Sequence, residues 1–331
     1  MSLEDIEIMK KLVKVFLFVM LGMICLTACK PEEVVKENLE ENNSEKETFH
    51  FAYSCITMDN PFFISLENYL RTAIEEEGHT MITLNAESDA EQQNEQIMGL
   101  LEQEVDAVFV SPVDWIEITP AIQALKEAGI KVINIDTQVQ AFDLVDAYIG
   151  SDNTNAGYLC GKDMLEKLPE GGKIIIVECP NRNSINERIK GFEKAIAGKG
   201  FEVVARIDAK GDLDVALPEV EEVLKNNPDI VAIMCGNDPT ALGALVAANA
   251  VGSKELIIYG IDGSPEVKKE LAKENSLIAA TVAQSTEKMA NEAATVAMKI
   301  LNQQSYERVI YIETVLIDKE NIAEYEVDRW Q

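Results

Sequence analysis

The sequence predicts an α/β protein made of two doubly wound, predominantly parallel-sheet lobes. From Phe49 onward, short apolar segments alternate with amphipathic segments of helical length, which is the pattern of repeated strand–helix units. The alternation restarts after Ser151, and apolar segments such as Lys173–Glu178 are continuous, as in strands covered by helices on both faces. At 331 residues the chain is long enough for two domains of ordinary size.

The first lobe contains five predicted strands with helices between them. We expect the strands at Phe49–Cys55, Thr80–Asn85, Ala107–Ser111, Val132–Asp136 and Ala147–Gly150. We expect the helices at Pro61–Glu77, Asp89–Gln103 and Trp115–Ala128. Right-handed crossovers between parallel strands then put helices on both faces of one sheet.

The second lobe repeats this order. Its strands are predicted at Lys173–Glu178, Val203–Asp208, Ile230–Cys235, Leu256–Gly260 and Ile278–Ala283. Its helices are predicted near residues 154–168, 186–199, 214–226, 239–250, 265–273 and 286–302. The two runs predict two sheets that follow one another along the chain.

The N-terminus has the features of an export signal. Residues 10–14 include three lysines, and a short apolar run over Val15–Cys25 follows them. This order is typical of a secretory signal peptide, and the run is too short for a comfortable membrane span. We therefore predict a signal peptide over residues 1–28. Acidic residues near Met1 are unusual in such a signal, so a start of translation at Met9 is an alternative.

The signal ends in Leu26-Thr27-Ala28-Cys29, which resembles the lipobox of bacterial lipoproteins. In that motif the cysteine is lipidated and becomes the mature N-terminus, so we predict lipidation of Cys29. The alternative is an unlipidated signal peptide with a chance cysteine. The polar residues that follow predict a flexible tether over 29–48 and an extracytoplasmic location, on the outer face of the cell membrane or in the periplasm.

The charge balance excludes two classes of partner. Acidic residues outnumber basic ones by 58 to 29, which gives a net charge of −29. A protein of this charge repels the phosphate backbone of nucleic acids and anionic lipid head groups. We therefore expect no nucleic acid partner.

Four of the six cysteines fall in the predicted lobes. They are Cys55, Cys160, Cys179 and Cys235. Their even number leaves disulfides open, but none has CxxC spacing and three lie at the ends of separate predicted strands. Buried free thiols are the favoured interpretation.

The first strand is followed by Asn60-Pro61-Phe62-Phe63, just before a predicted helix. Ligands of open α/β sheets bind beyond the carboxyl ends of the strands, which is where these residues fall. An amide and two aromatic rings could form a polar contact and an apolar wall there. The alternative is that Pro61 begins the helix and both phenylalanines pack its first turn into the core.

Polar residues follow several other predicted strands at the same end of the sheets. In chain order they are Asp136, Arg188, Asn237-Asp238, Asp262 and Gln284. If the two lobes face each other across these ends, the carboxylates, guanidinium and amides converge in one cleft with the two phenylalanines. Such a set suits a small polyhydroxylated ring with one apolar face.

Each of these polar residues also has a purely structural interpretation. Asp136, Asp238 and Asp262 are candidates for helix N-caps, and for Asp238 capping is the better interpretation. The segment at Asp262 is also compatible with a plain turn. Arg188 could pair with a neighbouring glutamate on the surface, and Gln284 could end a strand without touching a ligand. The coincidence of several polar strand ends favours a binding site.

At these residues the chain resembles the ribose-type periplasmic sugar-binding proteins, the substrate-binding components of ABC importers. The resemblance covers nearly all of the chain from Phe49 onward and lies in the order of its motifs. They are Asp59-Asn60-Pro61-Phe62-Phe63-Ile64-Ser65-Leu66, Gly150-Ser151-Asp152-Asn153, Asn186-Glu187-Arg188, Gly191-Phe192, Asn237-Asp238, Ala241-Leu242-Gly243-Ala244-Leu245, Gly260-Ile261-Asp262-Gly263 and Ala279-Ala280-Thr281-Val282-Ala283-Gln284.

The resemblance implies the type I periplasmic binding protein fold, in which a three-stranded hinge joins the lobes. It implies crossings between the lobes near Ser151, Gln284 and Glu313. The expected N-terminal lobe is residues 49–151 plus 285–313, and the expected C-terminal lobe is residues 152–284 plus 314–331.

The resemblance also implies roles for the residues of the cleft. Phe62 and Phe63 would stack on a sugar ring. The residues that would hydrogen-bond its hydroxyls are Asn60, Asp136, Arg188, Asn237, Asp262 and Gln284.

Two positions depart from the ribose binders. Those proteins carry arginine directly after the aspartate, where this chain has Thr137, which we keep among the expected ligand-binding residues. They also have an aromatic residue in the second lobe, where this chain has Ala209-Lys210-Gly211-Asp212. A hydrogen bond to a charged group contributes about 1.5–3 kcal/mol, so the missing arginine argues against ribose itself. A larger or differently hydroxylated ligand could fill the room.

We expect a monomeric, extracytoplasmic substrate-binding component of an ABC importer. It would capture a small neutral sugar or sugar-like polyol by hinge closure and present it to a membrane permease. No cofactor or metal is expected, because residues 208–214 do not match the spacing of a calcium loop. The alternative is a sensory binding protein for a receptor or an autoinducer-2 type signal.

Two other classes are disfavoured. An enzyme is not expected, because the chain has only two histidines, His50 and His79, and no HExxH, GxSxG or GxxxxGK[ST] motif. A regulator of the lac-repressor type would need a basic helix-turn-helix, which residues 1–48 do not offer.

Overall fold

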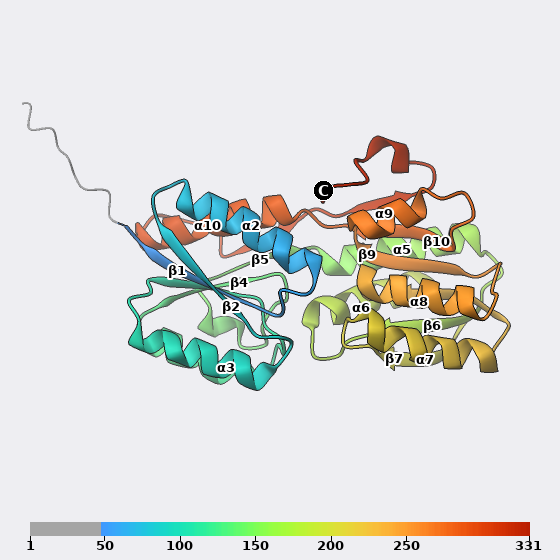
Figure 1. Cartoon of the computed structure of the whole chain (residues 1–331), viewed down its shortest axis with the longest axis horizontal. Coiled ribbons are helices and arrows are strands. Elements are labelled where there is room, and N and C mark those ends of the chain that lie inside the picture. The colour runs from blue at the N-terminus through green and yellow to red at the C-terminus, as the bar shows by residue number, and fades with distance from the viewer. Residues whose placement is uncertain (1–47) are drawn as a thin grey trace, which may run out of the picture. The chain divides into compact units, whose positions relative to one another are not determined.

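Two six-stranded sheets organise residues 48–331, the part of the chain that the computed structural model describes (Figure 1). The predicted signal peptide, tether and lipidation site at Cys29 lie outside these residues. The predicted class, two lobes of parallel-dominated sheets with flanking helices, is confirmed.

The first sheet contains parallel strands in the order β11-β5-β4-β3-β1-β2. Its strands are β1 (His50–Cys55), β2 (Thr80–Asn85), β3 (Ala107–Val110), β4 (Lys131–Ile135), β5 (Ala147–Ser151) and β11 (Val309–Ile312). The helices α2 (Pro61–Glu75) and α10 (Thr286–Leu301) cover one face, and α3 (Ala90–Gly99) and α4 (Thr119–Glu127) cover the other.

The second sheet has the order β12-β10-β9-β8-β6-β7, with β12 antiparallel at its edge. Its strands are β6 (Gly172–Glu178), β7 (Phe201–Asp208), β8 (Ile230–Cys235), β9 (Ile257–Asp262), β10 (Ile278–Ala283) and β12 (Val315–Asp318). One face is covered by α5 (Asn153–Lys167) and α6 (Asn183–Ile196), and the other by α7 (Leu213–Asn226), α8 (Asp238–Ala250) and α9 (Pro265–Leu271).

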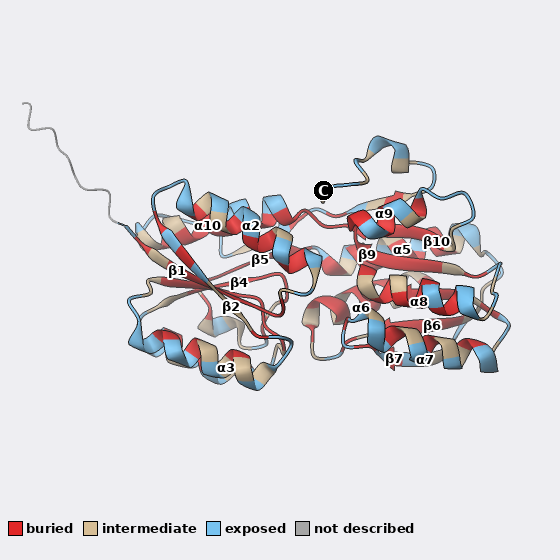
Figure 2. Cartoon of the chain, in the orientation of Figure 1, coloured by how far each residue is buried: buried red, intermediate tan, exposed pale blue. Residues whose placement is uncertain are grey.

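The continuous apolar strands form the middle of each lobe. Figure 2 shows the strands largely buried and the helices buried along one side only, as expected for amphipathic helices on a sheet. The four cysteines of this part are free thiols, and all are buried, as the sequence predicted. Burial raises the pKa of the Cys55 thiol to about 12.

The chain passes between the two sheets three times, between β5 and α5, between β10 and α10, and between β11 and β12. These passages support the lobe boundaries near Ser151, Gln284 and Glu313 that we propose. The lobes also touch through loops, because the backbone N–H of Trp115 donates to the carbonyl oxygen of Asn181 at 3.1 Å.

Residues 319–331, the C-terminal segment, follow β12 and reach from one lobe to the other. The Lys268 ammonium on α9 donates to the carbonyl oxygens of Glu326, at 2.7 Å, and Arg329. The Trp330 ring then packs edge-on against Phe62 of α2, with ring centroids 5.8 Å apart. The segment is thus fastened to the second lobe and contacts the first.

Several element boundaries differ from the prediction. The helix expected from Trp115 begins at Thr119, because the Asp114 side chain accepts hydrogen bonds from two backbone N–H groups, at 2.8 and 2.9 Å, and closes a turn there. The helix expected near residue 186 begins at Asn183. The strands β11 and β12 have only four residues each and were not individually predicted.

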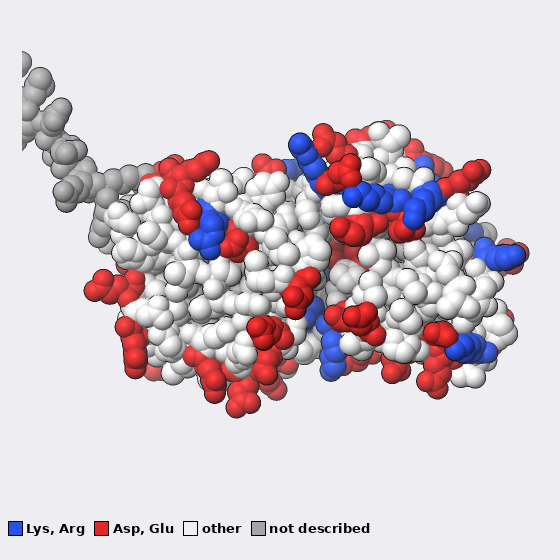
Figure 3. All heavy atoms as spheres, viewed as in Figure 1, with Lys and Arg blue, Asp and Glu red and all other residues white. Residues whose placement is uncertain are grey.

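The visible surface is strongly acidic, with Asp and Glu side chains spread over both lobes and fewer basic ones (Figure 3). Within residues 48–331, no helix combines the length and the apolar character that a membrane crossing requires.

Candidate functional site

The carboxyl ends of the strands in both sheets line a small cavity, the inner site, of about 20 Å³. Its lining contains every ligand-binding residue that the sequence predicted except Thr137. The lining residues are Asn60, Phe62, Phe63, Asp136, Arg182, Ser184, Ile185, Arg188, Asn237, Asp262 and Gln284. Both lobes contribute to this set.

Asn60 has two functions in this arrangement. Its Oδ1 accepts a hydrogen bond from the backbone N–H of Phe62 at 2.9 Å, so it is the N-cap of α2, and Pro61 is the first helical residue. The structural interpretation of this motif is therefore correct. The Asn60 Nδ2 donates to no residue of the described chain, which leaves it available in the inner site.

Phe62 and Phe63 are both core residues and wall residues. Each is only 3% exposed, and both belong to the apolar cluster under α2 and α10. Their rings meet edge to face with centroids 5.2 Å apart. Since both also line the inner site, their packing fixes the position of an apolar wall.

Asp136 follows β4 with a φ of 64°, in the left-handed region. It begins no helix among the described elements, so the capping interpretation is wrong for this residue. Burial raises the pKa of its carboxyl, while the guanidiniums of Arg188 and Arg182 and a hydrogen bond from Thr137 lower it. The net result is a raised Asp136 pKa, because burial of the carboxyl is the largest effect.

Thr137 does not line the inner site but hydrogen-bonds two residues that do. Its hydroxyl donates to Asp136 Oδ2 at 3.1 Å and shares a hydrogen bond with the Ser184 hydroxyl at 2.7 Å. Thr137 is fully buried, and Ser184 rather than Thr137 lines the cavity. This hydroxyl pair joins the two lobes.

Arg188 lies in the second turn of α6 and is 3% exposed, so the surface-pairing alternative is wrong. Its Nε donates to Asn153 Oδ1 at 2.8 Å, and its Nη1 donates to the Gly236 carbonyl oxygen at 2.8 Å. The same Nη1 lies 3.3 Å from Asp262 Oδ1. These contacts hold the guanidinium in one orientation.

Asp262 is the last residue of β9 and the centre of this network. The Gln284 Nε2 donates to its Oδ1 at 2.8 Å, and the backbone N–H of Asp238 donates to its Oδ2 at 3.2 Å. Burial raises the Asp262 pKa to about 7 against the attraction of Arg188, and the nearby Asp238 carboxylate adds to the rise. The Gln284 Oε1 is buried with no hydrogen-bond donor, so it is free to accept one from a ligand.

The N-cap of α8 is Asn237, not Asp238, so the capping prediction for Asp238 is wrong. Asn237 has extended backbone, and its Oδ1 accepts from the Thr240 N–H at 3.1 Å. Asp238 is the first helical residue and accepts hydrogen bonds at 2.7 Å from the Ser264 N–H and the Thr281 hydroxyl in the core. Asn237, one position earlier, has the backbone conformation and the side-chain hydrogen bond of the N-cap.

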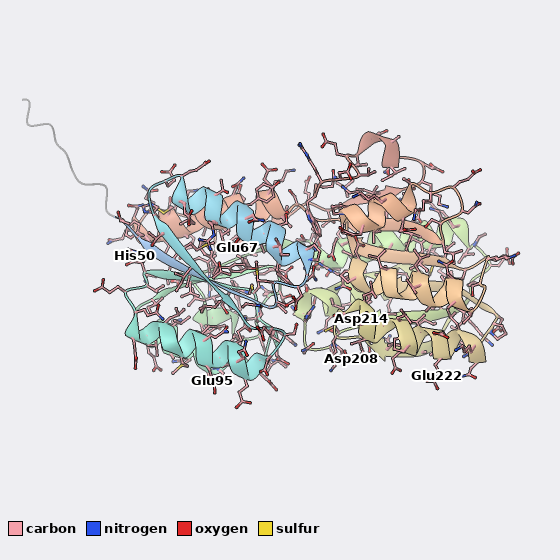
Figure 4. All side chains as sticks on the ribbon, viewed as in Figure 1. His50, Glu67, Glu95, Asp208, Asp214 and Glu222 are labelled. Atoms are coloured by element: carbon pink, nitrogen blue, oxygen red, sulfur yellow. The ribbon has the colours of Figure 1, made fainter. Side chains whose placement is uncertain are left out.

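A larger cavity, the outer chamber, of about 510 Å³, adjoins the inner site. The two cavities share Asn60, Arg182 and Asp262 in their linings. Trp330 of the C-terminal segment also lines the chamber. Figure 4 labels Asp208 at the end of β7 and Asp214 in α7, which flank the loop that contributes Lys210 and Gly211 to the chamber wall.

The sequence prediction missed Arg182 and Trp330. Arg182 immediately precedes α6, and its signal, a polar residue between a strand end and a helix, was overlooked because the helix was predicted to begin later. Trp330 gives no local signal, because its contact with Phe62 joins residues far apart in the sequence.

The arrangement provides hydrogen-bond donors and acceptors rather than a reactive group with an activated partner. Carboxylates, guanidiniums and amides from both lobes surround one apolar wall, which is the composition of a site for a small polar ligand. In residues 48–331 no cluster of three or more His, Cys, Asp or Glu side chains is placed to hold a metal ion.

Two α/β lobes with polar groups converging between them define a solute-binding protein. Residues 51–305 match the family model of the periplasmic binding protein domain, and the chain belongs to this family. The ribose import binding protein of Bacillus subtilis is 31% identical over 305 residues, which cover 91% of this chain and 97% of that protein.

Two solved structures are similar in fold and sequence. An ABC transporter solute-binding protein from Actinobacillus succinogenes with bound D-allose is 28% identical, with a TM-score of 0.77 over 84% of this chain and 100% of that one. One from Mycobacterium smegmatis with bound glycerol is 25% identical, with a TM-score of 0.80 over 84% of this chain and 96% of that one.

Proposed function

We propose that this protein is the extracytoplasmic binding component of an ABC importer and captures a small neutral sugar or polyol between its lobes. The observation that carries the proposal is the composition of the inner site. Two phenylalanine rings form one wall, and carboxylates, guanidiniums and amides from both lobes surround it. Relatives whose names or bound ligands are ribose, D-allose and glycerol support a polyhydroxylated ligand.

Capture requires no chemistry on the ligand. A sugar first binds the groups of one lobe, and bending at the three chain passages brings the other lobe against it. A ligand enclosed in this way gives hydrogen-bond partners to groups that lack them, such as the Gln284 Oε1. The closed form is then the form that a permease recognises.

Within this proposal, the nine predicted residues bind or support the ligand. They are Asn60, Phe62, Phe63, Asp136, Thr137, Arg188, Asn237, Asp262 and Gln284. Thr137 acts indirectly, through Asp136 and Ser184. A lipid on Cys29 would keep a monomeric binding protein beside its permease.

A thermal-shift screen tests the proposal. Residues 30–331 would be screened against pentoses, hexoses, polyols and autoinducer-2. A ligand at 100 times its dissociation constant stabilises a protein by about 2.7 kcal/mol, so a true ligand raises the melting temperature visibly. If no sugar or polyol raises it, the proposal is wrong.

Two controls sharpen this screen. Glu95→Gln changes an exposed residue of α3, far along the chain from the inner-site residues, and should respond to the ligand as the wild type does (Figure 4). The ligand recovered after long incubation should be chemically unchanged by NMR. Conversion of the ligand would contradict a role limited to binding.

A further inference from the structure

Arg182 has a buried guanidinium that makes no hydrogen bond to residues 48–331, although it lies close enough to Asp136 to lower the pKa of that carboxyl. The residue is 8% exposed, and its Nε is buried with no hydrogen-bond acceptor. No ion pair joins its guanidinium to any residue in 48–331. Arginine stays charged in proteins, and leaving its buried Nε–H without an acceptor is unfavourable. A ligand that brings an acceptor removes this penalty.

Gly211 provides the space that the guanidinium occupies. A Cβ atom at Gly211 would lie 2.5 Å from Arg182 Nη1, closer than such atoms approach one another. Gly211 also has a φ of 70°, which favours glycine. The chamber loop therefore has no side chain at the position where Arg182 lies.

Arg182 lies at the passage between the two cavities, because it lines both of them. The inner site, at about 20 Å³, has room for about one water molecule in this structure, so a sugar ring enters it only when the lobes separate. The outer chamber, at about 510 Å³, is within the range of ligand-binding pockets. A ligand confined to the inner site would leave the chamber empty. A ligand that extends past Arg182 would use both.

The charge of the outer chamber indicates that the part of the ligand extending past Arg182 is neutral. Its basic lining residues are Arg182 and Lys210, and its acidic ones are Asp59, Glu87, Asp212, Asp262 and Glu266. This excess of carboxylates disfavours an anionic substituent. Neutral hydroxyl groups can accept from Arg182 and donate to the carboxylates.

We propose that the ligand is a neutral saccharide larger than a pentose, with its ring in the inner site and a hydroxyl-bearing extension that passes Arg182 into the outer chamber. Arg182 donates hydrogen bonds to this extension and thereby selects for ligand size. The inference rests on the proposed sugar-binding function.

Pentose and hexose pairs of matched stereochemistry test the selection. In their pyranose forms, D-ribose and D-allose, D-xylose and D-glucose, and L-arabinose and D-galactose differ only by one hydroxymethyl group. Calorimetric titration of residues 30–331, whose described part is a compact unit of its own, should give the hexose of the preferred pair about tenfold tighter binding or better, which is about 1.4 kcal/mol. A pentose that binds as tightly as its hexose would overturn the proposal.

Arg182→Met removes the charge and keeps the length of the side chain. It should weaken hexose binding by about tenfold or more and pentose binding by about threefold or less. Equal weakening of both sugars, or none, would contradict the role of Arg182. Gly211→Ala displaces Arg182 Nη1 without removing the guanidinium, so it should also weaken hexose binding more than pentose binding.

The stability of the ligand-free variant separates a binding role from a structural one. Because the Arg182 side chain donates no hydrogen bond to any residue in 48–331, Arg182→Met should melt at the same temperature as the wild type or higher. A lower melting temperature would mean that Arg182 supports the fold, and the proposal would fail. If a pentose binds and Asp136→Asn abolishes that binding while Arg182→Met does not, the sugar-binding function stands and this inference is wrong. If no saccharide binds, both fail.

Discussion

Asp136 combines a buried carboxylate with a backbone conformation that few residues adopt. Its φ of 64° lies in the left-handed region, where asparagine and aspartate are tolerated better than other side chains. Asparagine is therefore a substitution that changes the charge and leaves the backbone unstrained.

We predict that Asp136→Asn weakens sugar binding by about tenfold or more, because a charged acceptor becomes a weaker neutral one. The free energy of unfolding of the ligand-free protein should change by less than about 1 kcal/mol, since burial already disfavours the ionised carboxyl. Calorimetry and urea denaturation measure the two effects. Unaltered affinity would remove Asp136 from the binding site.

Asp262 predicts a pH dependence with a definite sign. Its folded-state pKa of about 7 lies above the unfolded value of about 3.9, so the folded state binds more protons between these values. The stability that this group contributes is fully present below about pH 4 and is lost as the pH rises through about 7.

Asp262→Asn removes this proton uptake. The stability of the wild type relative to the variant should fall between pH 4 and pH 8, by at most about 1.4 kcal/mol per pH unit. Urea denaturation at several pH values measures the difference. Glu222→Gln changes an exposed site on α7 (Figure 4), so its free energy of unfolding should depend on pH as that of the wild type does. If the stability of the wild type relative to Asp262→Asn rose with pH instead, the Asp262 pKa would be lowered in the folded state and the prediction would be wrong.

Among the elements, the C-terminal segment adds a link between the lobes to the three chain passages and the loop contacts. Lys268 holds its backbone on the second lobe, and Trp330 contacts Phe62 on the first. An aromatic pair of this kind contributes about 0.5–1.5 kcal/mol beyond its buried area.

We predict that Trp330→Ala lowers the free energy of unfolding by about 1–2 kcal/mol, through loss of the ring contact and of buried apolar area. Trp330→Phe should retain most of that stability because it preserves an aromatic contact. Equilibrium denaturation of both variants gives the comparison. Equal stability of wild type and Trp330→Ala would mean that the segment does not hold the lobes.

The sequence predicted the strands and the residues at their ends, but not the positions of Arg182 and Trp330. Continuous apolar runs predicted the strands, and parallel strands necessarily bring their carboxyl ends together, so Asp136, Asp262 and Gln284 were predicted at the cleft. The position of Arg182 depends on the direction of one side chain and on empty space above Gly211. Neither is encoded in a local pattern, and the same holds for the contact of Trp330.

At the scale of the whole molecule, three chain passages join the lobes, and loops touch across the cleft. We expect bending at the passages to move one lobe relative to the other. Binding that joins groups of both lobes should favour closed forms of the ensemble. We predict that saturating sugar lowers the radius of gyration measured by small-angle X-ray scattering. The same sugar should leave the radius of Asp136→Asn unchanged at a concentration that saturates only the wild type. No change in the wild type would contradict hinge closure.

The chain has two tryptophans, and both lie where the lobes meet. Trp115 bonds through its backbone to Asn181 across the cleft, and Trp330 packs on Phe62 beside the outer chamber. We therefore expect movement of the lobes to change the surroundings of the Trp330 indole and of the segment that carries Trp115. The protein carries its own fluorescent reporter, whose emission can be followed during a titration without labels, and Trp330→Phe reduces it to a single probe.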